Sequence, residues 1–180
     1  MLQIDIPAGE FWDERRNRFV NVPGTTLQLE HSLVSLSKWE SKWCKAFFSK
    51  REKTVDEILD YVQCMTLTPN VRPEVYASLS EDNIAQIRDY ISAPMTATVF
   101  PPDKKGANNR ETTTAELIYY WMISLNIPFE CQHWHLNRLL TLIRVCNVKN
   151  SPPKKTSRKE LASRYAAQNA ANRRRFGSRG

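Results

Sequence analysis

The sequence predicts a mainly α-helical domain with a small β element at its N-terminus and a basic arm at its C-terminus. Between residues 29 and 148, apolar side chains recur at steps of three to four residues, which is the repeat of an amphipathic helix. Leu2, Ile4 and Ile6 alternate instead, as side chains do along a strand. From residue 149 onward the composition changes to arginine, lysine and alanine.

These changes in pattern predict three segments: residues 1–28 as an extended or β-hairpin segment, residues 29–148 as the helical core domain, and residues 149–180 as a basic flexible tail. Residues 149–180 hold ten Lys/Arg and one acid, a net charge of +9, whereas residues 1–148 hold 16 basic and 18 acidic residues, a net charge of −2. The excess positive charge therefore lies in the tail and indicates a separate role for it.

The N-terminal segment predicts a hairpin. Pro7-Ala8-Gly9 turns the chain after the first alternating stretch. The following EFWDERRNRFVNV has aromatic and branched residues on both sides of a polar stretch near 13–17. We expect Phe11 and Trp12 on one strand and Phe19 and Val20 on the other.

The first two helices are predicted from their stripes and caps. Leu33, Leu36, Trp39, Trp43 and Phe47 recur at helical spacing. The next helix starts at Thr54, whose side chain can accept from the backbone of Glu57 while Glu57 reaches back, as in a capping box.

Three further helices follow. Ser80 is the expected cap of a short helix that buries Ile84, Ile87 and Ile91, and Thr96–Phe100 is a candidate strand. TTTAELIYYWMISLN is apolar on most sides and is expected to be a central helix that ends at Asn126. Pro128 suits the first turn of a last core helix to about Val148, which would make an antiparallel hairpin with its predecessor. In the tail, residues 158–169 are expected to be at most transiently helical.

The stretch FECQHWHLNR, residues 129–138, concentrates residues that bind metals or catalyse reactions. On a helix, Cys131 and His135 share a face, His133 points away at about 200°, and Cys146 lies about 16 Å further along the axis. A tetrahedral zinc site needs its ligands at about 2.0–2.3 Å. At most Cys131 and His135 could share a metal, with other ligands from elsewhere in the chain, so we expect structural histidines and no metal site.

No catalytic motif appears in the sequence. Nucleotide-binding glycine loops, the nucleophile elbow and the zinc-protease helix motif are all missing from it. The carboxylates Glu57, Glu81 and Asp82 occupy cap and surface positions. The four cysteines form no C-x-x-C pair, so we expect buried, reduced thiols. The sequence thus predicts a protein without enzymatic activity.

Two surfaces remain as candidates for binding partners. Asn137, Arg138, Thr141 and Arg144 make a polar stripe along the last core helix, with Trp134 at its head. The tail can neutralise phosphates, dock on an acidic or helical protein, or only keep the chain soluble. The candidate partner-binding residues are Trp134, Arg138, Arg144, Lys154, Lys155, Arg158, Arg173, Arg174 and Arg175.

Several segments in order resemble the tail assembly chaperones of long-tailed bacteriophages. They are LQLEHSLVSLSKWESKW, KTVDEILDYVQCMTLTPNV, MTATVF and TTAELIYYWMISLNIPFECQHWHLNRLLTLIRVCNVKNSPPKK. Within that family, the segments resemble in particular the group with a WHLNRLLTLI helix and an arginine-rich C-terminal end. It runs from about Leu27 to Gly180, and residues 1–26 add little to it.

The resemblance implies a function in virus assembly. Such chaperones bind the long tape measure protein in the host cytoplasm while tail tube subunits polymerise around it, and they are usually absent from the finished virion. Many exist in a short and a frameshifted longer form. The family implies no catalytic residue and no cofactor, and coating a long client is compatible with a homo-oligomer.

Two other classes of function stay open at this point. The chain can be a virion structural protein of the neck or tail, or a nucleic-acid-binding protein that uses the basic tail. No apolar run reaches the roughly 20 residues of a membrane span, and the N-terminus does not resemble a signal peptide. The sequence therefore favours a cytoplasmic protein whose partners are other proteins, with nucleic acid as the less favoured ligand.

Overall fold

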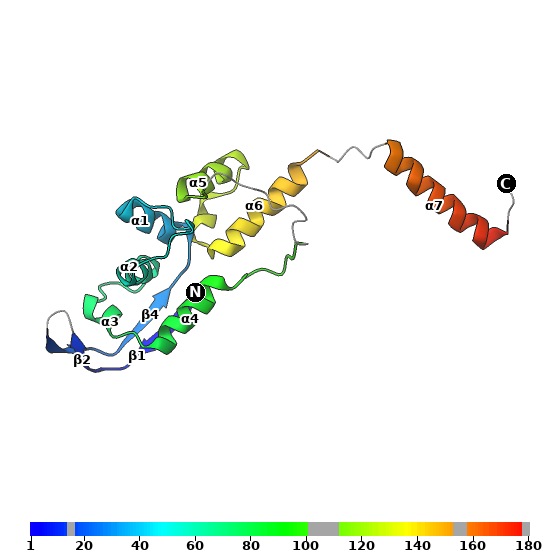
Figure 1. Cartoon of the computed structure of the whole chain (residues 1–180). Coiled ribbons are helices and arrows are strands. Elements are labelled where there is room, and N and C mark those ends of the chain that lie inside the picture. Colours follow the sequence, from blue (N-terminus) through cyan, green and yellow to red (C-terminus); the bar gives the residue numbers. More distant parts are fainter. Residues whose placement is uncertain (14–16, 101–111, 153–157, 178–180) are drawn as a thin grey trace. The chain divides into compact units, whose positions relative to one another are not determined.

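The computed structural model describes residues 1–13, 17–100, 112–152 and 158–177 and confirms the mainly α-helical class with a small N-terminal β element (Figure 1). Its contacts divide the chain into two compact units, Met1–Asn147 and Val148–Gly180. The elements are β1 (Leu2–Ile6), β2 (Gly9–Asp13), β3 (Arg18–Val22), β4 (Thr25–Leu29), α1 (Leu33–Trp43), α2 (Val55–Met65), α3 (Pro73–Ala77), α4 (Glu81–Ser92), α5 (Ala115–Ser124), the 3₁₀ helix η1 (Phe129–His133), α6 (Leu136–Asn150) and α7 (Arg158–Phe176).

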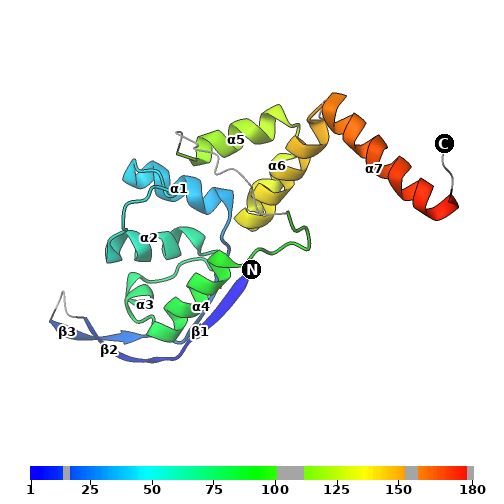
Figure 2. The same ribbon diagram turned by 45° about the vertical axis from the view of Figure 1, so that its right-hand side comes forward.

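The four strands form two antiparallel pairs, β1 with β4 and β2 with β3. The predicted hairpin is confirmed, and Trp12 lies opposite Phe19 in it. Ile4 and Leu27 are partners in the other pair and both are buried. Figure 2 shows the two pairs following one another along one side of the helices. The strands therefore supply one apolar face to the first unit.

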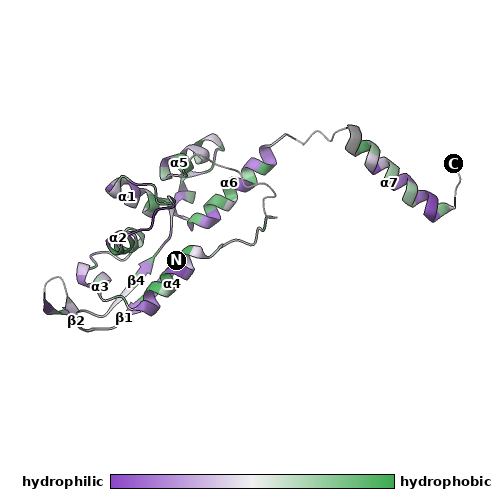
Figure 3. Ribbon diagram, viewed as in Figure 1, coloured by the Kyte–Doolittle hydropathy of each residue, from purple (hydrophilic) through white to green (hydrophobic). Residues whose placement is uncertain are grey.

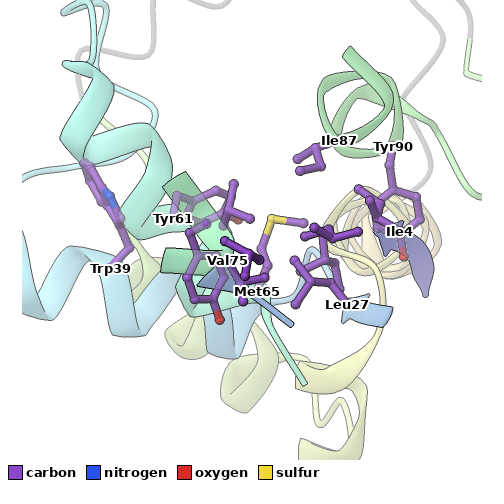
Figure 4. Close-up of a cluster of buried hydrophobic side chains, with 13 residues drawn as sticks. Ile4, Leu27, Trp39, Tyr61, Met65, Val75, Ile87 and Tyr90 are labelled. Carbon is purple, nitrogen blue, oxygen red and sulfur yellow. The ribbon is translucent and has the colours of Figure 1, made fainter. Parts of the chain in front are cut away.

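A first core cluster lies between this face and the helices α1 to α4. Figure 4 shows Met65 of α2 at its centre, with Leu27 and Ile4 from the strands and Ile87 and Tyr90 from α4 around it. Met65 and Leu27 are completely shielded from solvent. Full burial of one apolar side chain of this size contributes about 1.5–3 kcal/mol to the stability of the fold. The β element is thus held to the helices by a shared core.

A second core cluster joins α1 to α5 and α6. It contains Leu33 and Leu36 of α1 together with Ile118, Met122 and Leu139, among others. Trp39 of the same α1 belongs to the first cluster. Because α1 contributes to both clusters, it is the element that connects the two halves of the unit.

The predicted starts of two helices, α2 and α4, are confirmed. Thr54 and Glu57 form the expected capping box of α2, and Ser80 caps α4. α1 ends earlier than predicted, because Cys44 adopts a left-handed conformation with φ of 50°. In α4, Ile87 is buried as predicted, whereas Ile84 and Ile91 are only half-buried. Tyr90, which was not predicted to be buried, is the other core residue of this helix.

Two predictions around the second half of the unit were wrong. Residues 96–100 form no strand in the described chain. The last core helix does not run on from Pro128: the chain makes η1, becomes extended at Trp134 with ψ of 161°, and starts α6 at Leu136. The break is held from elsewhere in the fold, since the Leu136 N–H donates to the His31 carbonyl at 2.7 Å.

The second unit contains α7, which continues seven residues beyond the transient helix predicted over 158–169. All its described side chains, Leu161 to Phe176, are exposed. In Figure 3, hydrophilic and hydrophobic residues follow one another along this helix. Among the helices that the structure describes, none combines the length and the apolarity that crossing a membrane requires.

Candidate functional site

The surface side of α6 carries two arginines stacked on aromatic rings. The Arg138 guanidinium lies 4.1 Å from the centre of the Trp134 ring, and the Arg144 guanidinium lies 4.3 Å from the centre of the Phe100 ring. Both arginines are exposed, while both rings are half-buried. We call these four residues the α6 arginine surface.

The fold positions this surface from beneath. Leu136, Leu139 and Ile143 of α6 are buried in the second core cluster, and Trp134 packs partly against the same cluster. Stacking on a ring contributes about 0.5–1 kcal/mol at an exposed site, and it holds the planar guanidinium in one orientation. The N–H groups on the edge of the Arg138 guanidinium can donate to carboxylate or amide oxygens of a partner. The arrangement therefore suits recognition of acidic or amide-rich protein surfaces.

The predicted polar stripe on α6 is narrower than expected. The Asn137 side chain donates to the carbonyls of Ile91 and Ala93, both at 2.9 Å. Asn137 is thus half-buried and fastens the end of α4 to α6. The Thr141 hydroxyl donates to the Asn137 carbonyl at 2.8 Å, inside the helix. Of the stripe, only Arg138 and Arg144 remain exposed.

A pair of buried histidines, His31 and His135, lies next to this surface. A structural role was expected for His135, but its pairing with His31 was not predicted. The rings of His31 and His135 are 5.1 Å apart. His31 Nδ1 lies 2.5 Å from the Tyr61 hydroxyl, and His135 Nε2 lies 3.0 Å from the Tyr90 carbonyl. Burial, with a smaller contribution from His135, lowers the pKa of His31 to about 3. Burial also lowers the pKa of His135.

The pair works as a structural joint. With these pKa values both imidazoles are neutral at physiological pH, so they can hydrogen-bond without carrying charge into the interior. The backbones of His135 and Ser32, the N-cap residue of α1, also form an isolated antiparallel β-bridge. The joint therefore links α1, α2 and α4 to the beginning of α6.

The shared helical face predicted for Cys131 and His135 was wrong, because the helix is interrupted between them. Cys131 is buried in η1, His133 is exposed, and His135 faces Tyr90. In the described part of the chain, no three His, Cys, Asp or Glu residues are grouped so as to hold a metal ion. All four cysteines are free, and the expectation that they are buried is confirmed for Cys131. It is wrong for Cys64 and Cys146, which are half-buried, and for Cys44, which is exposed.

Buried carboxylates serve as anchors for backbone and cations. Glu57 accepts from the Thr54 N–H at 2.9 Å, from Lys45 at 2.9 Å and from Arg51 at 2.6 Å. These contacts, the backbone bond first, lower its pKa to about 2. Glu40 accepts from two backbone N–H groups, those of Phe47 and Ala115, both at 2.7 Å. Glu40 thereby ties the N-terminus of α5 to α1.

The remaining predicted partner-binding residues belong to the basic tail. Lys154 and Lys155 lie outside the described residues. Arg158 is the first residue of α7, and Arg173, Arg174 and Arg175 form its exposed last turn. The two groups of predicted residues thus lie in different units, and each is considered by itself.

No protein-family model, no curated protein and no solved structure matches this chain.

Proposed function

We propose that this protein is a bacteriophage tail assembly chaperone. In this proposal it acts without catalysis in the host cytoplasm. It binds the tape measure protein, helps to recruit tail tube subunits, and is absent from the finished virion. The ordered segments that resemble this family are the basis of the proposal.

The observation that carries the proposal is how the signature stretch WHLNRLLTLI divides in space. Leu136, Leu139 and Ile143 enter the core, and His135 and Asn137 bind neighbouring elements. Core packing accounts for those residues. It leaves Trp134 and Arg138 as a stacked pair at the surface, where a protein client can reach them. Tryptophan and arginine are the residue types that most often dominate binding energy at protein interfaces.

Exposed apolar side chains add surface that a long helical client can cover. Tyr120 and Ile123 lie one turn apart on α5 and are 62% and 61% exposed. Val55 and Ile58 repeat this spacing on α2. Such i, i+3 pairs are the contacts used when amphipathic helices associate. Because a long client needs many copies to coat it, we also propose weak self-association of the chaperone.

Co-expression with the tape measure protein of the same genome tests the proposal. Wild-type chain should keep that protein in the soluble fraction and co-purify with it. The double variant Trp134→Ala/Arg138→Ala should lose most of both effects. Arg88→Ala is the matched control, because Arg88 is an exposed arginine on α4 and its loss removes the same charge elsewhere. Failure of the wild type to retain the tape measure protein would overturn the proposal.

A virion structural role is the outcome to be separated from it. Mass spectrometry of purified particles should find this chain missing or far below the copy number of the tail tube subunit. Stoichiometric amounts in mature virions would contradict a chaperone and favour a neck or tail component.

A further inference from the structure

Helix α7 takes no part in the proposed client-binding surface, and its exposed side chains are distributed unevenly around the helix. Its described side chains are all exposed, and its only large apolar residues there are Leu161, Tyr165 and Phe176. Leu161 and Tyr165 lie at one end of the helix and Phe176 at the other. A helix that docks in a protein groove needs apolar anchors at successive turns. The middle of α7 has none, because Gln168, Asn169 and Asn172 occupy that face.

The three amides project from one side of the helix. At about 100° per residue, Asn172 lies roughly 40° and Asn169 roughly 100° around the helix from Gln168. Leu161, Tyr165 and Phe176 fall within the same arc. We call this arc the amide face. Asparagine and glutamine can bond two atoms of an adenine edge at once, and apolar groups contact the thymine methyl group.

Arginines border the amide face on both sides. Measured from Gln168, Arg175 and Arg164 lie at roughly −20° and −40°, beyond one edge, and Arg173 lies at roughly 140°, beyond the other. Arg174 lies at roughly 240°, on the opposite side of the helix. A groove with negative charge on both walls would meet both borders at once.

Away from the arginines, many of the other side chains of α7 are small. Ala162, Ala166, Ala167, Ala170 and Ala171 fill the sides and back of α7. Side chains this small let the walls of a groove approach the helix backbone. The B-DNA major groove, about 12 Å wide, accommodates an α-helix and is lined by phosphates.

We propose that α7 binds duplex DNA by lying in the major groove, with Arg164, Arg173 and Arg175 on the phosphates and the amide face toward the base edges. Three phosphate contacts give a slope of about −2.7 in log affinity against log salt concentration. Affinity should thus fall about 40-fold between 50 and 200 mM salt. The binding is independent of the proposed chaperone function, because DNA alone is the ligand.

The test uses the full chain and a fluorescein-labelled 20-bp DNA duplex, with affinity measured by fluorescence anisotropy between 50 and 200 mM salt. Arg175→Gln and Arg174→Gln are neighbours that remove the same charge from different sides of α7. We expect Arg175→Gln to weaken binding at least about threefold and to reduce the salt slope by about one. Arg174→Gln should change affinity by less than about twofold.

Three further measurements keep the proposal open to contradiction. The variant Gln168→Ala/Asn172→Ala should reduce any preference for A·T-rich over G·C-rich duplexes, since these amides contact adenine edges. A polyglutamate of matched charge should compete poorly, and an A-form RNA duplex, whose major groove is too narrow for side chains to read, should bind more weakly than DNA. No anisotropy change with DNA, equal losses for the two arginine variants, or tighter binding to polyglutamate or RNA would each overturn DNA binding by α7.

Discussion

Helices α6 and α7 are both longer than most in this protein, yet they are stabilised in different ways. α6 has 15 residues and buries Leu136, Leu139 and Ile143, whereas α7 has 19 residues and none of its described side chains is buried. Isolated helices shorter than about 12–15 residues are marginal in water even when rich in alanine, and most helices in proteins owe their stability to packing. Helix α6 is therefore stabilised by the core that it completes, whereas α7 relies on the local helix propensity of its sequence.

The largest effect is expected from the core side of α6. Leu139→Ala removes a side chain that is fully shielded, and such a change costs about 2–5 kcal/mol because it leaves a cavity. The free energy of unfolding, measured by urea denaturation and far-ultraviolet circular dichroism, should fall by that amount.

The same substitution in α7 is its control. Leu161 is 39% exposed, so Leu161→Ala should leave the free energy of global unfolding within about 0.5 kcal/mol of that of the wild type. Equal losses for the two variants would contradict the division drawn between the two helices.

A smaller loss of stability is expected when Glu40, which binds the N-terminus of α5, is changed. Glu40→Gln weakens two hydrogen bonds from backbone N–H groups to a buried carboxylate, and bonds to charged groups contribute about 1.5–3 kcal/mol each. We expect about 2 kcal/mol less stability in urea titrations. Glu116→Gln, an exposed acid in the first turn of the same helix, should be nearly neutral.

Acid should weaken the first unit, Met1–Asn147, but not the helicity of α7. The folded pKa of His31, about 3, lies below its ordinary value of 6.5. Folding therefore favours the neutral ring, so its contribution is complete above about pH 6.5 and is lost as the pH falls toward 3. His135 acts in the same direction, and Glu57, with a pKa lowered from 4.5 to about 2, adds a loss below about pH 4.5.

Thermal unfolding followed by circular dichroism from pH 8 to pH 4 measures this effect. The melting temperature should hold above pH 7 and then decline, and His31→Gln should decline less steeply from a lower starting value. Parallel curves for the two proteins would show that another group controls the acid sensitivity.

The smallest effect on global stability is expected from a break in α7. Ala167→Pro removes a backbone donor in the helix interior, which costs about 3 kcal/mol of helix stability. The helical signal should drop while the cooperative unfolding midpoint stays unchanged. A shift of that midpoint would mean that α7 is coupled to the core.

What the sequence predicted well was local. The capping box of Thr54 and Glu57, the cap at Ser80 and the hairpin of Trp12 and Phe19 depend on residues that are neighbours along the chain or across one turn. In each case the interaction follows from spacing, so pattern and structure agree.

What the sequence missed depends on distant residues. The start of α6 is fixed by the bond between the Leu136 N–H and the His31 carbonyl, and the histidine joint pairs residues from opposite ends of the domain. No periodicity records such contacts. For the candidate site, the sequence placed Trp134 at the head of the stripe that contains Arg138, but on a helix that starts only at Leu136. Neither the stacking of Arg138 on Trp134 nor that of Arg144 on Phe100 was predicted.

The double role of α1 has a consequence for how the chain is synthesised. Trp39 can be covered as soon as residues 55–65 leave the ribosome, but Leu33 and Leu36 are completed only when α5 and α6 arrive. The ribosome adds about 5–20 residues per second. Synthesis from Leu36 to Ile143, the last buried residue of that cluster in α6, therefore takes roughly 5–20 s. During that interval Leu33 and Leu36 stay exposed on the incomplete chain, where they can associate with other unfinished chains.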